Sequence, residues 1–222
     1  MITLAIDASI SIGDVALLDD ARVVAELSVE MKSPTVERLM PAVASVLGQN
    51  GVAPRELDRI VCGAGPGSFT SLRIAGGIAK GLSAGANVPL YAAPSLGLMV
   101  AGASLPVGRY LAAADALRGE SYVALYHVSA TGDVIELEHA MVVAAASVLD
   151  LATRAEAHIV SPTPIADDVI RALPRAAGVA RLEGLLTASG PVDLASWEPT
   201  YGRLAEAQVK WETLHGRPLP VG

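Results

Sequence analysis

The sequence predicts an α/β fold in which one β-β-β-α-β-α unit occurs twice and forms two subdomains. In each half, short segments with the alternation of strands precede longer segments with helical periodicity. The halves also match in register, because residues 5–8 (AIDA) and 113–116 (AADA) correspond at an offset of 108 residues. The Val-Ala-Leu of the following strand recurs at the same offset. An acid, Asp7 or Asp115, is therefore expected to end the first strand of each half.

The first half is predicted from alternating apolar residues in its strands and from start and stop residues at its helices. Ser33 as a cap and Pro34 in the first turn are typical of a helix start. The expected elements are strands at 2–7, 13–18 and 22–29, a helix at 34–47, strands at 60–64 and 88–91, and helices at 74–85 and 94–101. The first subdomain is predicted to cover residues 1–102, with a last helix at about 204–215 packing on it.

The second half repeats this order and is predicted to cover residues 103–195. Residues 131–133 (TGD) indicate a hairpin turn within it. The expected elements are strands at 110–115, 121–127, 134–142 and 158–160 and helices at 145–153 and 164–173. Two such units facing across a cleft are typical of actin-like proteins, the ASKHA or ribonuclease H-like group, in which the two strand-end acids face a nucleotide. Residues 174–197 give no clear pattern.

Composition excludes several classes of protein. The formal net charge is −7, with 23 acids and 16 bases and no basic stripe, which argues against unaided binding to RNA. The chain contains one cysteine, Cys62, so an internal disulfide is excluded. No uncharged apolar run reaches about 18 residues, and an acid at position 7 interrupts any signal peptide. We therefore expect a cytoplasmic protein without a membrane partner.

The segment 65–71 (GPGSFTS) joins a predicted strand to a predicted helix. Its glycines permit a sharp bend, and its amides and hydroxyls could meet a phosphate at the helix start. The alternative is a tight connection with a structural role only. It is neither a Walker A loop nor a dinucleotide fingerprint, because no Gly-Lys-Ser/Thr closes it and Thr70 stands in place of the third glycine. The phosphate-loop or structural candidates are Asp7, Gly65, Gly67, Ser68, Thr70, Arg73 and Asp115.

Catalytic groups are not evident in the sequence. The four histidines fall in no HExxH pattern, and no His, Cys, Asp or Glu cluster has metal-ligand spacing, so no metal is expected. Asp7 and Asp115 lack the adjacent glycines of phosphate-binding strand turns, which favours structural roles for both. No cofactor is predicted, and the binding of a nucleotide in the cleft is left as an alternative.

Two predicted helices carry more apolar or small residues than one sheet requires. The apolar residues of 34–47 span an arc of about 160°, whereas packing on one sheet needs about 100°. The helix 74–85 places Gly77, Gly81 and Gly85 at four-residue spacing, which permits another backbone to approach. Packing on its own sheet is the alternative. The predicted docking residues are Val36, Leu39, Met40, Val43, Gly77, Lys80, Gly81 and Ala84.

These residues resemble the TsaB (YeaZ) family, the bacterial partner subunits in threonylcarbamoyladenosine modification of tRNA. The resemblance is carried by residues 4–7 (LAID), 63–74 (GAGPGSFTSLRI), 76–82 (GGIAKGL), 114–116 (ADA) and 198–201 (EPTY). It implies an actin-like fold without transferase activity, a heterodimer with the catalytic paralogue TsaD, and recruitment of the ATPase TsaE. It also implies contact with tRNA only through the complex, and leaves homodimerisation of the free chain open.

Three functions remain as hypotheses. The first is a non-catalytic scaffold subunit that dimerises with TsaD. The second is an active small ATPase or kinase of the actin and hexokinase superfamily. The third is a peptidase acting on the paralogue, an activity attached to the wider family. Many relatives have a His near the start of the first helix, where this chain has residues 33–35 (SPT), and this weakens the peptidase hypothesis.

Overall fold

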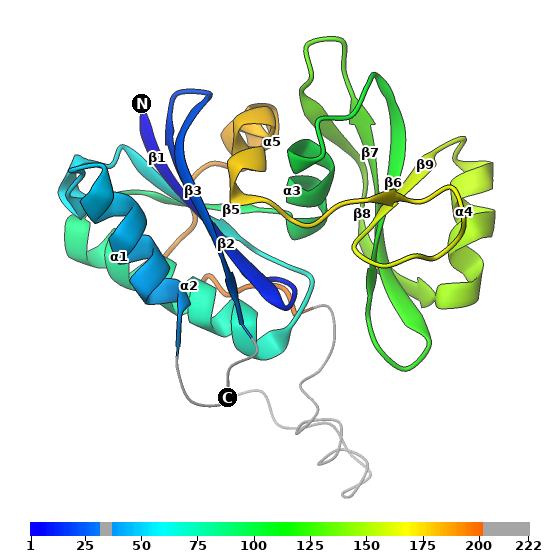
Figure 1. Ribbon diagram of the computed structural model, residues 1–222, viewed down its shortest axis with the longest axis horizontal. Coiled ribbons are helices and arrows are strands. Elements are labelled where there is room, and N and C mark those ends of the chain that lie inside the picture. Colours follow the sequence, from blue (N-terminus) through cyan, green and yellow to red (C-terminus); the bar gives the residue numbers. More distant parts are fainter. Residues whose placement is uncertain (32–36, 202–222) are drawn as a thin grey trace, which may run out of the picture.

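Two five-stranded mixed sheets lie side by side, one in each half of the chain (Figure 1). This computed structural model describes residues 1–31 and 37–201. The first sheet has the strand order β3-β2-β1-β4-β5 and the second the order β10-β9-β6-β7-β8. The expected helix at about 204–215 and the docking residue Val36 lie outside the described residues.

The first half contains five strands and three α-helices in the described residues. They are β1 (Ile2–Asp7), β2 (Ile12–Asp19), β3 (Arg22–Glu30), α1 (Leu39–Gln49), β4 (Arg59–Gly63), α2 (Phe69–Ala86), β5 (Leu90–Ala93) and α3 (Ser95–Gly102). A short 3₁₀ turn, η1 (Pro54–Glu56), precedes β4.

The second half and the segment that follows it contain the remaining elements. They are β6 (Gly108–Asp115), β7 (Glu120–Val128), β8 (Val134–Ala144), η2 (Ala145–Ser147), α4 (Val148–Arg154), β9 (His158–Ser161), β10 (Ile170–Arg171), η3 (Ala176–Arg181) and α5 (Glu183–Ser189). No helix of the described residues combines the length and the apolar character needed to cross a membrane.

The two sheets confirm the predicted duplication. Each central strand pairs antiparallel with the strand that follows it, β1 with β2 and β6 with β7. Each also pairs parallel with the first strand after the helix, β4 or β9. Asp7 and Asp115 therefore end topologically equivalent strands.

Helix α3 lies between the sheets and is buried on nearly all sides, as its uniformly apolar sequence requires (Figure 1). Its residues Leu96, Leu98 and Met99 share one core cluster with Tyr110 and Tyr126 of the second sheet. The halves are consequently joined by a continuous apolar core.

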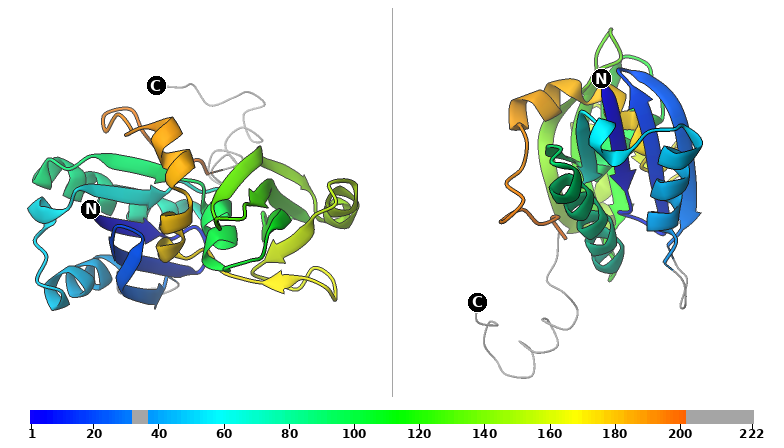
Figure 2. Two further views of the ribbon diagram at one scale, coloured as in Figure 1. Left: turned by 90° about the horizontal axis from the view of Figure 1, so that it is seen from above. Right: turned by 90° about the vertical axis from the view of Figure 1, so that its left-hand side faces the viewer.

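Helices α1, α2 and α4 cover outer faces of the sheets. Helices α1 and α2 cover one face of the first sheet, with Leu39, Val43 and Ala75 in their shared core. Helix α4 covers the outer face of the second sheet through Val148 and Ala152. The right-hand view of Figure 2 shows α1 and α2 on the same side of the first sheet.

The segment after β10 returns to the first sheet. Ala176 and Val179 of η3 pack in the core cluster around Ala5 and Ala16. Further along, the Val192 amide donates to the Leu90 carbonyl at 2.8 Å, and both views of Figure 2 show α5 beside the first sheet. Within the predicted second subdomain, 103–195, η3 thus packs on the face of the first sheet opposite α1 and α2, whereas Val192 and Leu194 pack on the apolar cluster that α1 and α2 share.

Three predicted elements differ from the structure. Helix α1 begins at Leu39, while the start predicted at Pro34 lies outside the described residues, and α2 begins at Phe69 rather than at Ile74. The helix predicted at 164–173 is wrong, because this described segment forms a loop and the short strand β10. Ile165 and Val169 pack on the apolar cluster of the second sheet from that loop, so their helix-like spacing reflects burial alone.

Candidate functional sites: the cleft and the outer helical face

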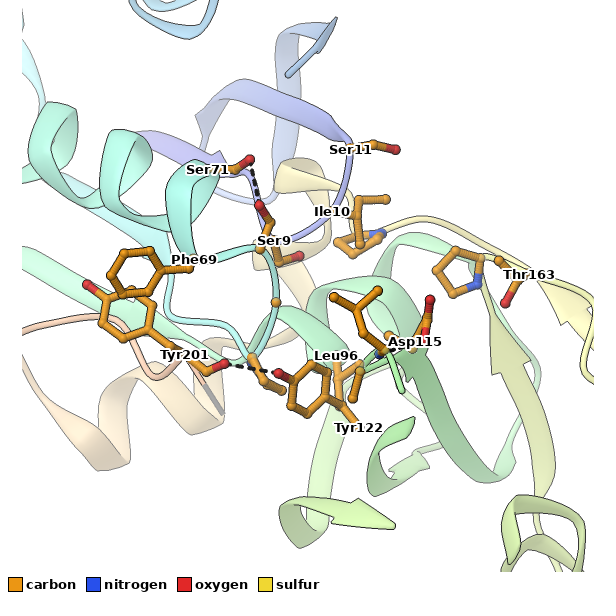
Figure 3. Close-up of a pocket in the computed structure, with 18 of the residues that line it drawn as sticks. Ser9, Ile10, Ser11, Phe69, Ser71, Leu96, Asp115, Tyr122, Thr163 and Tyr201 are labelled. Atoms are coloured by element: carbon orange, nitrogen blue, oxygen red, sulfur yellow. Dashed lines mark hydrogen bonds between the residues drawn. The ribbon is translucent and has the colours of Figure 1, made fainter. Parts of the chain in front are cut away.

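A cleft of about 1170 Å³ opens between the halves at the ends of β1 and β6 (Figure 3). One wall consists of residues 9–12, which lead from β1 into β2, and 66–71, which lead into the first turn of α2. The opposite wall consists of residues 114–118, the end of β6 and the turn that follows it, with Tyr122 and Thr163. The duplicated unit thus places the same strand ends on both sides of one cavity.

Gly65 and Gly67 allow three chain segments to meet at the cleft wall. Gly65 has φ +88°, and a Cβ there would collide with the Thr200 carbonyl oxygen. A Cβ at Gly67 would collide with the Ser9 carbonyl oxygen, which accepts a hydrogen bond from the Ser68 amide at 2.7 Å. Both glycines therefore have a structural role, and the Ser68 amide is already used.

Ser68, Thr70 and Arg73 form the beginning of α2, with Ser68 at the N-cap position. The Ser68 and Ser71 hydroxyl oxygens lie 3.0 Å apart, and Thr70 lines the cleft. The Arg73 guanidinium lies 5.1 Å from the centre of the Phe69 ring. Arg73 thus packs on an aromatic side chain.

Tyr201 closes one end of the cleft (Figure 3). Its ring centre lies 4.5 Å from that of Phe69, and its carbonyl oxygen accepts a hydrogen bond from the Tyr122 hydroxyl at 3.1 Å. Sequence reasoning missed Tyr122 and Thr163 as cleft residues, because neither belongs to a motif and only the folded sheet brings them to this wall.

Asp7 is fully buried at the end of β1. Its carboxylate accepts hydrogen bonds from the Ser9 amide at 2.9 Å, the Ser9 hydroxyl at 2.8 Å and the Ser95 hydroxyl at 2.6 Å. Burial raises the pKa of Asp7, and these hydrogen bonds act in the opposite direction. The carboxylate joins β1 to the start of α3, which is a structural arrangement.

Asp115 is exposed at the end of β6 and lines the cleft. Its carboxylate accepts a hydrogen bond from the Leu117 amide at 2.7 Å, which stabilises the turn after the strand. The two equivalent acids therefore occupy different environments.

The described residues do not form a metal site. In the ranges 1–31 and 37–201, no group of three or more His, Cys, Asp or Glu side chains could hold a metal ion. Cys62 is buried in β4, and burial followed by the charge of Asp7 raises the pKa of its thiol far above the ordinary value.

The outward sides of α1 and α2 form a second candidate site on the opposite side of the first half. A Cβ added at Gly77, Gly81 or Gly85 would meet no described atom within 4 Å. By contrast, a Cβ at Gly76 would lie 3.1 Å from Pro199 and 3.7 Å from the Trp197 ring. The glycines of α2 thus divide into a row that faces outward and one residue that the chain itself covers.

Several predicted docking residues are engaged inside the chain. Leu39 and Val43 are fully buried in the core of the first half, so they have no surface to offer a partner. Lys80 donates a hydrogen bond from Nζ to the Trp197 carbonyl oxygen at 2.9 Å. Met40 is 41% exposed, and Ala84 is also exposed.

Helix α1 contributes residues that the predicted docking set omitted. Ala44 and Gly48 follow Met40 at four-residue spacing, and both are exposed. Their four-residue spacing and small side chains are the features of the sequence that could have placed them in the docking set. The outer helical face is the set Met40, Ala44, Gly48, Gly77, Gly81 and Ala84.

Comparisons with known proteins agree with this architecture. A family model described as "TsaD: tRNA N6-adenosine threonylcarbamoyltransferase" matches residues 33–160, which is more than half of the chain. The chain is 38% identical over 131 residues to the tRNA threonylcarbamoyladenosine biosynthesis protein TsaB of Escherichia coli, covering 58% of this chain and 56% of that protein. It is 38% identical over 126 residues to the Bacillus subtilis protein of the same name, covering 57% and 55%.

A solved structure agrees over a longer range. YeaZ from Pseudomonas aeruginosa superimposes with a TM-score of 0.73 and 26% identity, covering 90% of this chain and 99% of that one. In sequence, the chain spans about half the length of the curated relatives that it matches. The chain belongs to the family that the matching model describes and, within it, to the TsaB (YeaZ) proteins.

Proposed function

We propose that this chain is a non-catalytic subunit of the complex that transfers threonylcarbamoyl to adenosine 37 of tRNAs reading codons that begin with A. The observation that carries the proposal is the likeness to two proteins named for threonylcarbamoyladenosine biosynthesis. We propose the TsaD paralogue as the catalytic partner and the ATPase TsaE as a further component. Contact with tRNA then occurs through the complex.

A supporting role fits the chemistry of the cleft better than phosphoryl transfer. The acid that ends β1 is buried and fully engaged with Ser9 and Ser95. Phosphoryl transfer depends on groups that position a metal and a nucleophile at the transferred phosphate. Asp7 cannot reach such a position without breaking the hydrogen bonds that join β1 to α3.

The outer helical face is the proposed contact with the catalytic paralogue. Small residues on both helices let the helices of a partner approach closely, and Met40 adds apolar area. Since the matching family model bears the name of the catalytic protein, the partner is expected to present two equivalent helices. The free chain would use the same face for a homodimer.

The test uses cells depleted of this protein and tRNA analysed by mass spectrometry. Depletion should lower the threonylcarbamoyladenosine content, and the full chain supplied in trans should restore it. A tagged chain should co-purify with the catalytic paralogue. Unchanged modification after depletion would contradict the proposal, and rapid ATP turnover by the purified chain would favour the kinase alternative.

A further inference from the structure

The chain crosses from the second half back to the first through residues 172–175, which link β10 to η3. This segment is called the return crossing. At its end, the Ala176 amide donates a hydrogen bond to Asp14 Oδ1 on β2 at 2.7 Å. The crossing is thus fixed to the first sheet by a side chain from another part of the sequence.

Asp14 is the buried member of a cluster of charged groups in which Arg175 is 39% and Glu26 24% exposed. Its side chain is 1% exposed, and Oδ2 accepts a hydrogen bond from the Ser28 hydroxyl at 2.5 Å. Arg175 Nε lies 3.6 Å from the same oxygen. Arg175 also binds Glu26 of β3, with Nε 2.9 Å from Oε1 and Nη2 2.7 Å from Oε2. In the described part of the chain, the charged groups that act on Asp14 are Glu26 and Arg175.

The cluster lies directly behind the cleft. Pro174, the residue before Arg175, lines the cavity together with Leu173. On the other strand, Ile12 lines it two residues before Asp14. A shift of the return crossing relative to β2 would therefore move two parts of the cleft wall apart.

We propose that Asp14, Glu26 and Arg175 form a latch that holds the return crossing on the first sheet and that tightens when Asp14 takes up a proton. The latch acts on the cleft of the isolated chain. It extends beyond the proposed role in tRNA modification and does not depend on it.

The direction follows from linkage between protonation and conformation. Burial raises the pKa of Asp14 to about 6, and the charge of Glu26 adds to this. Hydrogen bonds from Ser28 and Ala176 and the charge of Arg175 oppose the shift. When the crossing is released, water reaches Asp14 and its pKa returns toward 3.8. Because the latched form binds the proton more tightly, acidification favours it.

The size of the effect can be set from these two pKa values. When the pH falls from 7 to 5, the ratio of latched to released molecules should rise about tenfold. Release is a local opening, so the Ala176 amide reports it by hydrogen exchange. After correction for the intrinsic pH dependence of exchange, protection of Ala176 should rise about tenfold over this range.

Asp14→Asn provides the first test, because the amide keeps the shape and an acceptor oxygen but cannot titrate. Its Ala176 protection should be flat between pH 7 and pH 5. The matched control is Asp19→Asn at the exposed end of the same strand, which should keep the full pH dependence. The same pH dependence in Asp14→Asn as in the unmodified chain would overturn the proposal.

A second variant keeps the proposal testable if Asp14→Asn does not fold. Glu26→Gln removes the charge that raises the Asp14 pKa and frees Arg175 to approach Asp14. The pH at which protection changes should therefore move lower. A direct NMR titration of the Asp14 carboxyl in the unmodified chain completes the test, and a midpoint below about 4.5 would overturn the latch.

Discussion

The carboxylates of Asp7 and Asp115 end equivalent strands but act on different neighbours. Asp7 is buried and receives three hydrogen bonds from Ser9 and Ser95, whereas Asp115 is exposed and stabilises the turn at Leu117. Because the pKa of Asp7 is raised in the folded chain, the free energy of unfolding is lower at pH values where Asp7 is ionised than at low pH, where it is protonated. Its hydrogen bonds are what retain the charge inside the fold.

The Asp7→Asn chain should therefore fold, and its complex should modify tRNA at a rate within a few-fold of the complex with the unsubstituted chain. The amide oxygen can still accept from Ser9 or Ser95, and the cost of a buried charge is removed. Asp7→Ala should lose about 1–3 kcal/mol in urea unfolding, because two buried hydroxyls then lack their acceptor. A hundredfold loss of tRNA modification in a folded Asp7→Asn complex, about 2.7 kcal/mol, would make the acid catalytic.

At the residue scale, the sequence indicates which segments form the cleft wall but not which residues they contact. Gly65 and Gly67 were recognisable as bend residues, but their partners, Thr200 and Ser9, are far away in sequence and follow only from the fold. The orientation of Arg73 toward Phe69 could not be predicted, because α2 begins five residues earlier than its pattern indicated.

Among the elements, helix α2 has two sides with different roles. One side packs on the first sheet through Leu72, Ala75 and Ala79, while Gly76 accommodates Pro199 and Trp197 of the same chain. The side bearing Gly77 and Gly81 has open space around it in the described structure. A glycine in a helix interior costs up to about 1 kcal/mol relative to alanine, so an outward row of glycines is unfavourable for the isolated chain.

Gly81→Leu should leave the free chain folded and prevent assembly with the catalytic paralogue. The added side chain meets no described atom of its own chain within 4 Å at Cβ, but it would hold a partner helix away. Circular dichroism and size-exclusion chromatography with the partner measure the two effects, and the threonylcarbamoyladenosine content of tRNA should fall in parallel.

The matched control is Gly76→Leu, on the covered side of the same helix. Its side chain would displace Pro199 and Trp197, so the free chain should lose stability in urea unfolding before any partner is added. A folded Gly81→Leu chain that still binds the paralogue normally would exclude the outer helical face as the contact.

The order of elements could be predicted from sequence for most of the chain, because strands and helices carry their own periodicity. The error at 164–173 has a physical origin: Ile165 and Val169 are spaced like a helix face, but they cover the sheet from a loop. Likewise, the predicted docking set includes the buried residues Leu39 and Val43, because the width of an apolar arc does not say which part of it is already buried.

At the scale of the whole molecule, residues 176–201 follow the second half in sequence and bind to the first sheet. Arg59 of β4 is buried and binds Glu183 of α5 through both guanidinium Nη groups, at 2.9 and 2.6 Å. Arg59 Nε also donates to the Thr3 hydroxyl at 3.0 Å. Further along, the Thr200 amide donates to the Ala64 carbonyl at 2.7 Å. The C-terminal part of the described chain is thus anchored on the first sheet at several points.

Glu183→Gln should lower the free energy of unfolding by about 1–2 kcal/mol. This value lies between those for exposed and for buried ion pairs, because Glu183 is 49% exposed and Arg59 only 7%. Hydrogen bonding to Arg59 lowers the pKa of Glu183, so its contribution is present above the unfolded pKa of about 4.5 and is lost as the pH falls through the folded value. Urea unfolding at pH 7 and pH 3 measures both effects.

The control for this variant is Asp150→Asn, which breaks an ion pair with Arg154 that is exposed on both sides. It should change the free energy of unfolding by less than about 0.5 kcal/mol. An equal loss in the two variants would show that the Arg59–Glu183 pair has no special role in anchoring α5 on the first sheet.

The return of η3 to the first sheet also has a consequence for synthesis on the ribosome. The first sheet is complete once β5 has emerged, but η3, which covers one of its faces, is translated about 80 residues later. At about 5–20 residues per second the nascent chain would expose that apolar face for roughly 4–16 s. We expect ribosome-bound chains that end near residue 130 to bind chaperones and resist protease poorly, and chains extended beyond residue 201 by a linker to be protected. Equal protection at both lengths would show that the first half folds without its cover.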